Sequence, residues 1–138
     1  MTMPPPLGRA AKRPDTIAPD GSEIRLLAIS EHGATRASLC EVRLGPGCVS
    51  RPIAHRTVEE IWYVLDGRGK VWRSPPGARA TPVDLTPGDS VVIPRGWHFQ
   101  FSAGDDGPLR FLCHTSPPWP GPDEAVPVPS GGLGEPTV

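Results

Sequence analysis

The chain has 138 residues, a length typical of one domain, and it includes 20 prolines and 16 glycines. Its 14 basic and 15 acidic side chains give a net charge of −1, so no electrostatic pattern favours nucleic acid or an anionic membrane as a partner. No apolar stretch is long enough to span a bilayer, and residues 1–11 lack the apolar run of a signal peptide. We therefore expect a cytoplasmic protein with neither nucleic acid nor a membrane as its partner.

The two ends of the chain differ in composition from its middle. Residues 1–15 are predicted to form a flexible N-terminal arm, because a proline-rich, polar segment cannot bury enough apolar surface to become ordered. Residues 16–118 are predicted to form the single domain. Residues 119–138 form a Pro/Gly-rich C-terminal tail, in which Trp119 and Val126 could dock locally and residues 131–138 should be loose.

Short apolar runs separated by turn residues fill the predicted domain. In chain order the runs are Glu23–Ile29, Ala37–Leu44, Ile61–Leu65, Lys70–Trp72, Val83–Leu85, Val91–Ile93, His98–Phe101 and Leu109–Cys113. Close turn spacing and alternation within the runs are typical of an antiparallel sandwich or barrel. No segment of helical length keeps an apolar period of 3.6 residues without a Gly or Pro break. The sequence therefore predicts an all-β fold.

Two runs carry polar side chains where burial is expected. In residues 60–65, Glu60 and Trp62 share one face, and both faces are otherwise apolar, so the strand should be covered on both sides. A buried carboxylate such as Glu60 is costly unless it is paired, hydrogen-bonded or bound to a metal. In residues 98–102, His98 and Gln100 share a polar face that is backed by two phenylalanines. This stripe is typical of a strand that faces a pocket.

Two stretches resemble the conserved motifs of the cupin family. The segment GCVSRPIAHRTVEEIWYVLDG, residues 47–67, is similar to the first motif, with His55 at its second histidine, Glu60 at its glutamate and Ile53 at its first histidine position. The segment PGDSVVIPRGWHFQFS, residues 87–102, is similar to the second motif, but His98 comes one residue early. If the turn absorbs this deletion, His98 faces the pocket; if the strand register shifts, Phe99 takes that place. We expect the first outcome.

The resemblance implies a cupin-type jelly-roll β-barrel of antiparallel strands, often a homodimer. It also implies a divalent metal held by His55, Glu60 and His98, with Fe, Mn, Zn, Ni and Cu not distinguishable from the ligands alone. The same three residues are then the candidate catalytic residues. The candidate substrate pocket adds four further residues, which are Ile53, Trp62, Gln100 and His114.

The favoured interpretation is a small metal-binding cupin enzyme that acts on a small organic molecule in the barrel, as a dioxygenase, isomerase or lyase. Because Ile53 replaces a histidine, an alternative is a metal-free cyclase or isomerase in which Glu60 and a histidine act as acid and base. A non-catalytic module that binds a small ligand is a further alternative. The three cysteines, Cys40, Cys48 and Cys113, follow no zinc-ligand spacing and are expected to be reduced thiols.

Overall fold

A computed structural model describes residues 3–138 of the chain. Its strands are β1 (Thr16–Ile17), β2 (Glu23–Ala28), β3 (Ser38–Leu44), β4 (Ile53–His55), β5 (Glu59–Asp66), β6 (Gly69–Ser74), β7 (Val83–Leu85), β8 (Ser90–Ile93), β9 (His98–Ala103), β10 (Leu109–Ser116) and β11 (Ala125–Pro127). Two short 3-10 turns, η1 (Ser30–His32) and η2 (Pro122–Glu124), complete the described elements. The predicted all-β fold is confirmed. Within the described residues, no helix has the length and apolar character needed to cross a membrane.

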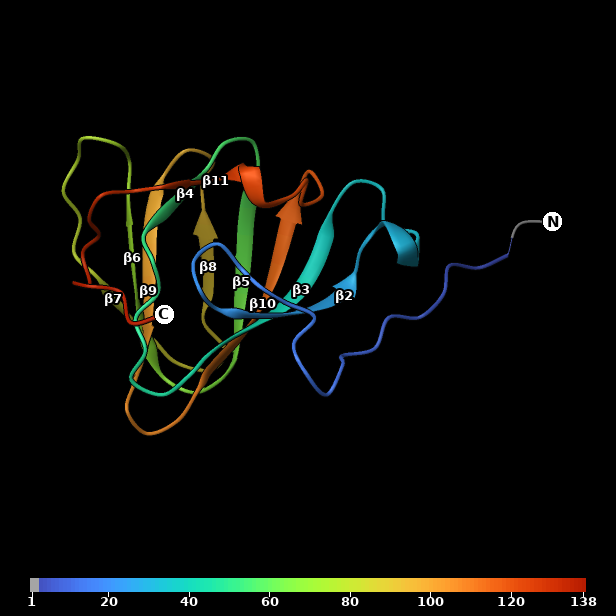
Figure 1. The fold of residues 1–138 in the computed structure, drawn as a ribbon, viewed down its shortest axis with the longest axis horizontal. Coiled ribbons are helices and arrows are strands. Elements are labelled where there is room, and N and C mark those ends of the chain that lie inside the picture. The colour runs from blue at the N-terminus through green and yellow to red at the C-terminus, as the bar shows by residue number, and fades with distance from the viewer. Residues whose placement is uncertain (1–2) are drawn as a thin grey trace.

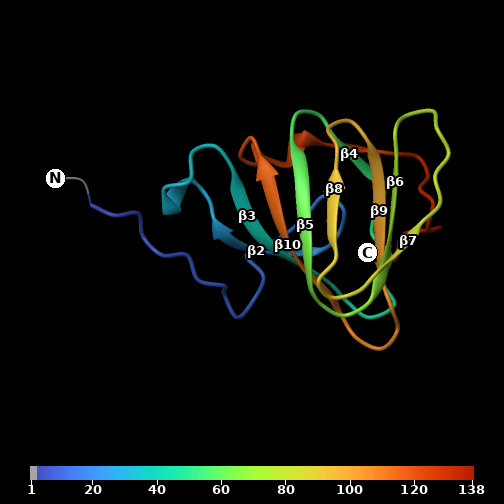
Figure 2. The same ribbon diagram turned by 180° about the vertical axis from the view of Figure 1, so that it is seen from behind.

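The strands form two antiparallel sheets that face one another in a jelly roll, as Figure 1 and the reverse view in Figure 2 show. One sheet has the order β1-β2-β3-β10-β5-β8, and the other has the order β11-β4-β9-β6-β7. Consecutive strands such as β4 and β5 lie in different sheets. Residues that are close in sequence, such as His55 and Glu60, therefore face one another from the two layers.

Aromatic side chains fill the centre of the barrel. Trp62 and Phe111 stack with ring centroids 4.1 Å apart, and Phe101 packs edge-on against both rings. All three are at most 1% exposed. Packing of this kind adds about 0.5–1.5 kcal/mol per aromatic pair beyond the burial of area.

Strand β9 has the register that we considered less favourable. Phe99 and Phe101 belong to the buried core, and Phe99 pairs with Ile53 of β4. Because neighbouring residues of a strand point to opposite faces, His98 and Gln100 point out of the barrel. The prediction that His98 faces the interior is therefore wrong. The two rings are larger and less polar than an imidazole and an amide, so burial of Phe99 and Phe101 decides the register.

The C-terminal tail is bound to the outer face of β9 rather than loose. The buried Gln100 amide donates from Nε2 to the Gly134 carbonyl at 2.8 Å, and its Oε1 accepts from the Leu133 amide at 2.8 Å. Farther along, Arg51 donates from Nε to the Val138 carbonyl at 2.9 Å. These bonds satisfy a buried amide that would otherwise be costly. Gln100 thus anchors the tail and does not line an interior pocket.

The described N-terminal segment first projects away from the barrel and then runs along the edge of the first sheet (Figure 1). Arg25 donates from Nε to the Ala11 carbonyl at 2.9 Å, and the Asp15 carboxylate accepts from the Leu26 amide at 2.8 Å. Residues 3–13 are exposed. The flexibility of this arm and the expected homodimer stay predictions.

Candidate functional site

Glu60 is the buried carboxyl group at the centre of the site. It lies on the inner face of β5, where its neighbours in the sheet are Thr115 of β10 and Ile93 of β8. The residue is 8% exposed, and its Oε1 accepts a hydrogen bond of 2.9 Å from the indole Nε1 of Trp62. Burial raises the pKa of Glu60 to about 7, although the bond from Trp62 acts in the opposite direction. Glu60 can therefore exist in both protonation states near neutral pH.

His55 faces Glu60 from the other sheet, at the end of β4. The residue is 3% exposed and packs edge-on against Phe99 and Trp119, with ring centroids 5.2 and 5.3 Å away. Burial lowers the pKa of His55 to about 4, so its imidazole is neutral at physiological pH. Within residues 3–138 its Nδ1 has no hydrogen-bond partner. An unpaired buried nitrogen is rare and is a candidate contact for a bound molecule.

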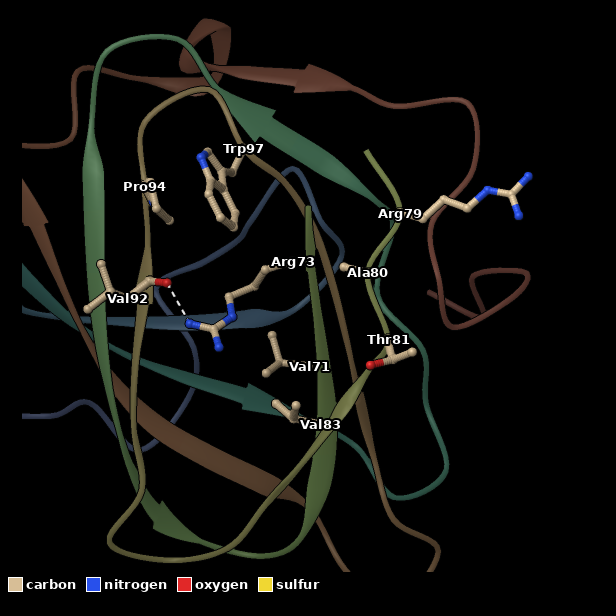
Figure 3. Close-up of a pocket in the computed structure, with 9 residues that line it drawn as sticks. All are labelled: Val71, Arg73, Arg79, Ala80, Thr81, Val83, Val92, Pro94 and Trp97. Atoms are coloured by element: carbon tan, nitrogen blue, oxygen red, sulfur yellow. Dashed lines mark hydrogen bonds between the residues drawn. The ribbon is translucent and has the colours of Figure 1, made fainter. Parts of the chain in front are cut away.

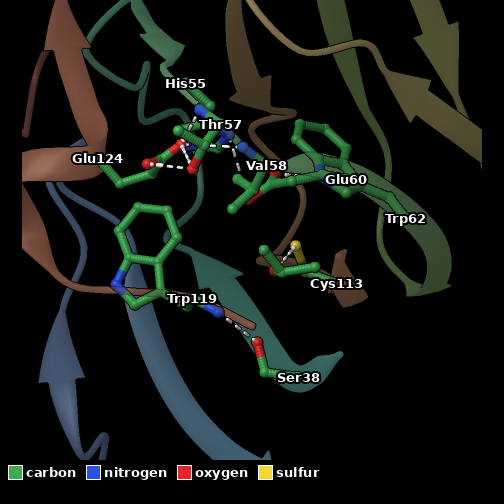
Figure 4. Close-up of polar contacts among 10 residues, drawn as sticks. Ser38, His55, Thr57, Val58, Glu60, Trp62, Cys113, Trp119 and Glu124 are labelled. Atoms are coloured by element: carbon green, nitrogen blue, oxygen red, sulfur yellow. Dashed lines mark hydrogen bonds and ion pairs between the residues drawn. The ribbon is translucent and has the colours of Figure 1, made fainter. Parts of the chain in front are cut away.

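The two groups approach each other without making a bond. Nδ1 of His55 lies 3.6 Å from Oε2 of Glu60 (Figure 4). This distance is too long for a hydrogen bond, and a neutral imidazole makes no ion pair. Catalytic groups often stand slightly apart in the free protein and tighten around a substrate. The arrangement offers a titratable proton on one side and a free nitrogen on the other.

Glu124 holds the turn that carries both groups, and sequence reasoning missed it. From η2, its carboxylate accepts hydrogen bonds from the Thr57 amide, from the Thr57 hydroxyl at 2.8 Å and from the Val58 amide at 2.9 Å (Figure 4). Although burial acts to raise the pKa of Glu124, these bonds lower it below its ordinary value. An ionised Glu124 thus fixes residues 57–58, which join His55 to the strand of Glu60. Its position in a proline-rich tail gave no periodic signal.

Trp119 and Cys113 complete the surroundings. Trp119 docks, as expected, over His55, and its backbone amide donates to the Ser38 hydroxyl at 3.1 Å. Cys113 is 3% exposed and lies beside Glu60, and it faces Cys40 across the β3–β10 pair (Figure 4 shows Cys113). The hydrogen bond to Cys40 and burial raise the pKa of the Cys113 thiol. The thiol therefore stays protonated and acts as part of the wall.

The other predicted site residues divide between the interior and the surface. Trp62 and Ile53 lie inside the barrel, 1% and 4% exposed, and Trp62 contacts the site directly through Glu60. His114 pairs with Ile61 and is exposed on the outer face of β10, so its predicted place in the pocket is wrong. It follows Cys113, which points inward, and the alternation of the strand turns it outward.

The residues present do not fit the expected three-ligand metal centre. His55 and Glu60 could offer Nδ1 and Oε2, but His98 lies on the opposite face of β9. Within residues 3–138 no group of three or more His, Cys, Asp or Glu side chains is placed to hold a metal ion. Protein metal sites usually need at least three protein ligands. Of the three expected ligands, only His55 and Glu60 therefore meet.

Comparison with known proteins places the chain in a family. The family described as Cupin domain matches residues 40–115, more than half of the chain. An uncharacterized protein of Methanocaldococcus jannaschii, MJ1618, is 30% identical over 111 residues, which are 80% of this chain and 85% of the relative. The chain therefore belongs to the cupin family.

Solved structures share the architecture. A structure of oxalate decarboxylase from Bacillus subtilis matches 93% of this chain with a TM-score of 0.76 and 17% identity, and this chain spans 33% of its length. The polyketide cyclase RemF from Streptomyces resistomycificus matches 88% of this chain and 80% of its own, with a TM-score of 0.63 and 26% identity. The decarboxylase likeness supports the fold, and the cyclase is a neighbour of similar size.

Proposed function

We propose that this cupin is an acid–base enzyme that moves a proton on a small organic molecule, as in an isomerisation or a cyclisation, and that Glu60 gives and takes that proton. The observation that carries the proposal is the buried pair of Glu60 Oε2 and His55 Nδ1, 3.6 Å apart, in which Nδ1 has no partner among the described residues. The pair matches the general requirement for a proton donor or acceptor next to a group that can orient the reacting atom.

The protonation states suit proton transfer at neutral pH. A general acid or base works best when its pKa lies near the working pH, and burial brings the pKa of Glu60 to about 7. The ionised form of Glu60 would remove a proton from a carbon next to a carbonyl, and the protonated form would return it to another atom. The neutral His55 would hydrogen-bond the carbonyl or enol oxygen through Nδ1, depending on the tautomer.

The walls of the site favour a substrate that is uncharged and at least partly aromatic. Phe99, Trp62 and Trp119 surround the two polar groups, and Trp119 is the one of these that is not buried. An ionised substrate would pay a large desolvation cost among these rings. The likeness to the polyketide cyclase RemF supports a substrate with neighbouring carbonyl groups. We therefore assign the substrate class as a small aromatic β-dicarbonyl compound.

Deuterium exchange into benzoylacetone, followed by proton NMR in heavy water, tests the proposal. We expect the protein to accelerate exchange at the carbon between the two carbonyls, because Glu60 can remove and return that proton. Glu60→Gln should lose the acceleration, whereas Glu59→Gln, its exposed neighbour, should keep it. Exchange that is no faster with the native protein than with Glu60→Gln contradicts the proposal.

The same assay separates this reaction from metal chemistry. Treatment with EDTA should leave the exchange rate unchanged if Glu60 itself is the base. Elemental analysis of protein purified without an affinity tag provides the matching control. A rate that falls with EDTA and returns with one divalent ion would instead support the metal-dependent alternative.

A further inference from the structure

A cavity lies at the edge of the barrel. It has a volume of about 850 Å³ and opens along the seam between strand β8 of one sheet and strands β6 and β7 of the other (Figure 3). Small-molecule sites typically have about 300–1,000 Å³. The lining includes Arg73, Arg79, Thr81, Val83, Val92 and Trp97, and it includes neither residue of the proposed acid–base pair.

Arg73 supplies the charge inside this cavity. Its guanidinium points toward β8 and donates one hydrogen bond, from Nη1 to the Val92 carbonyl at 2.9 Å (Figure 3). A guanidinium has five N–H donors. Among the described residues Arg73 forms no ion pair, whereas Arg43 and Arg110 bind the carboxylates of Glu23 and Glu41. No acidic residue in the described part of the chain lines the cavity, so the charge of Arg73 is not neutralised there.

The walls around this charge are apolar and partly exposed. Val83 and Val92 are 46% and 45% exposed on the two strand edges, which is high for valine side chains. The indole of Trp97 projects into the cavity from the turn before β9, while Arg79 points away from it (Figure 3). A flat apolar body can therefore lie between the valines and the indole, with an anionic group toward Arg73.

We propose that this seam binds a planar aromatic carboxylate, with the carboxylate on Arg73 and the ring system against Trp97. Guanidinium and carboxylate groups pair through two parallel hydrogen bonds, and aromatic rings stack favourably on an indole. The site is separate from the acid–base pair, so the proposal does not depend on the proposed function. The free donors of Arg73 fix the carboxylate end, and the valines set the apolar end.

Binding of a naphthalene carboxylate, measured by calorimetry and by the NMR shift of the Trp97 indole N–H, tests the proposal. The indole signal is assigned with Trp97→Phe. We expect saturable binding to the native protein and a shift confined among the indole signals to Trp97. Arg73→Gln should weaken binding by about tenfold or more, because a charge-assisted pair is lost. Arg36→Gln, an exposed arginine outside the cavity, should bind as the native protein does.

The neutral naphthalene carboxamide is the matched ligand control and should bind at least about tenfold more weakly than the carboxylate. Arg73→Lys, which keeps the charge but not the paired geometry, should fall between the native protein and Arg73→Gln. Thermal melting verifies that each variant is folded, and the Trp97 shift in the native protein remains informative if one is not. Absence of saturable binding, equal affinity for the carboxamide, or an unmoved Trp97 signal would overturn the proposal.

Discussion

The Nδ1 atom of His55 and the Oε2 atom of Glu60 lie 3.6 Å apart, and burial favours the neutral form of both residues. A pair that served only to stabilise the fold would be expected to share a proton through a shorter hydrogen bond. Here Nδ1 has no hydrogen-bond partner in residues 3–138, which costs stability. Residues held in a costly arrangement are candidates for function, and the pKa values of these two groups are shifted in opposite directions.

The first prediction concerns Glu60→Gln and pH. The folded pKa of Glu60 is raised to about 7 from 4.5, so its favourable contribution is present at low pH and is lost as the pH rises from about 4.5 to about 7. Glutamine removes this loss. We expect the stability of Glu60→Gln relative to the native protein to increase by on the order of 3 kcal/mol between pH 4 and pH 8.

His55 has the opposite effect in an overlapping range. Its folded pKa is lowered to about 4 from 6.5, so its contribution is present above 6.5 and is lost as the pH falls toward 4. The two effects oppose each other between about pH 4.5 and 6.5 in the native protein. Urea denaturation at several pH values should show the stability of Glu60→Gln rising with pH relative to that of the native protein. Parallel profiles for the two proteins would contradict the burial of Glu60 as a neutral acid.

The second prediction concerns Glu124, the carboxylate that holds residues 57–58. Glu124→Gln replaces a charged acceptor with a neutral one and should cost about 1–3 kcal/mol, because the partly buried bonds from Thr57 and the buried bond from the Val58 amide lose their charge assistance. The same variant should also slow the exchange reaction, since His55 and Glu60 flank this turn. Denaturation and exchange rates check the two effects. Asp123→Asn, the exposed neighbour, is the matched control.

The all-β class, the strand runs and the buried position of Glu60 could be predicted from the sequence, because alternation and turn residues are local signals. The face of His98 could not. A one-residue deletion before a strand can be absorbed by the turn or by the register, and the choice depends on which side chains the opposite sheet accepts. Trp62 of the opposite sheet packs edge-on against Phe99 here. That contact joins residues far apart in sequence and leaves no local trace.

The bound state of the C-terminal tail could not be predicted from the sequence for a similar reason. Its glycines indicate flexibility in isolation, yet a Cβ atom at Gly132 would lie 2.2 Å from Cδ1 of Trp72 and one at Gly131 would lie 2.3 Å from Oε1 of Gln100. Glycine is required there because the backbone packs directly on the side chains of β6 and β9. Composition alone does not distinguish a glycine that permits motion from one that permits contact.

The third prediction follows from this packing. Gly132→Ala should displace the tail from Trp72 and cost about 1–3 kcal/mol, since overpacking of a tight contact has a cost of this size. Gly107→Ala is the matched control, because a Cβ there meets no atom within 4 Å. Urea denaturation measures the stability, and hydrogen exchange at the Leu133 amide, which donates to Gln100, reports whether the tail stays bound. Equal stability and equal protection in both variants would contradict a structural role for the tail.

The fourth prediction tests the register of β9 through metal binding. Phe99 points into the barrel, and its ring centroid is 5.2 Å from that of His55, so Phe99→His places a second imidazole on the same side as His55 and Glu60. The variant should be destabilised without metal, because a polar ring replaces a buried apolar one. Zinc or nickel should then bind stoichiometrically and raise its melting temperature, since a ligand that binds only the folded state stabilises it.

The controls for this variant show whether zinc binding depends on which face of β9 carries the histidine. The native protein and His98→Ala should take up equally little zinc, because the imidazole at position 98 points out of the barrel. Phe99→His combined with Glu60→Gln should bind zinc at least about tenfold more weakly than Phe99→His alone, because a carboxylate ligand is lost. Calorimetry and elemental analysis measure both quantities. Stoichiometric zinc in the native protein that disappears in His98→Ala would show that His98 reaches the interior, and the orientation of β9 described above would then be wrong.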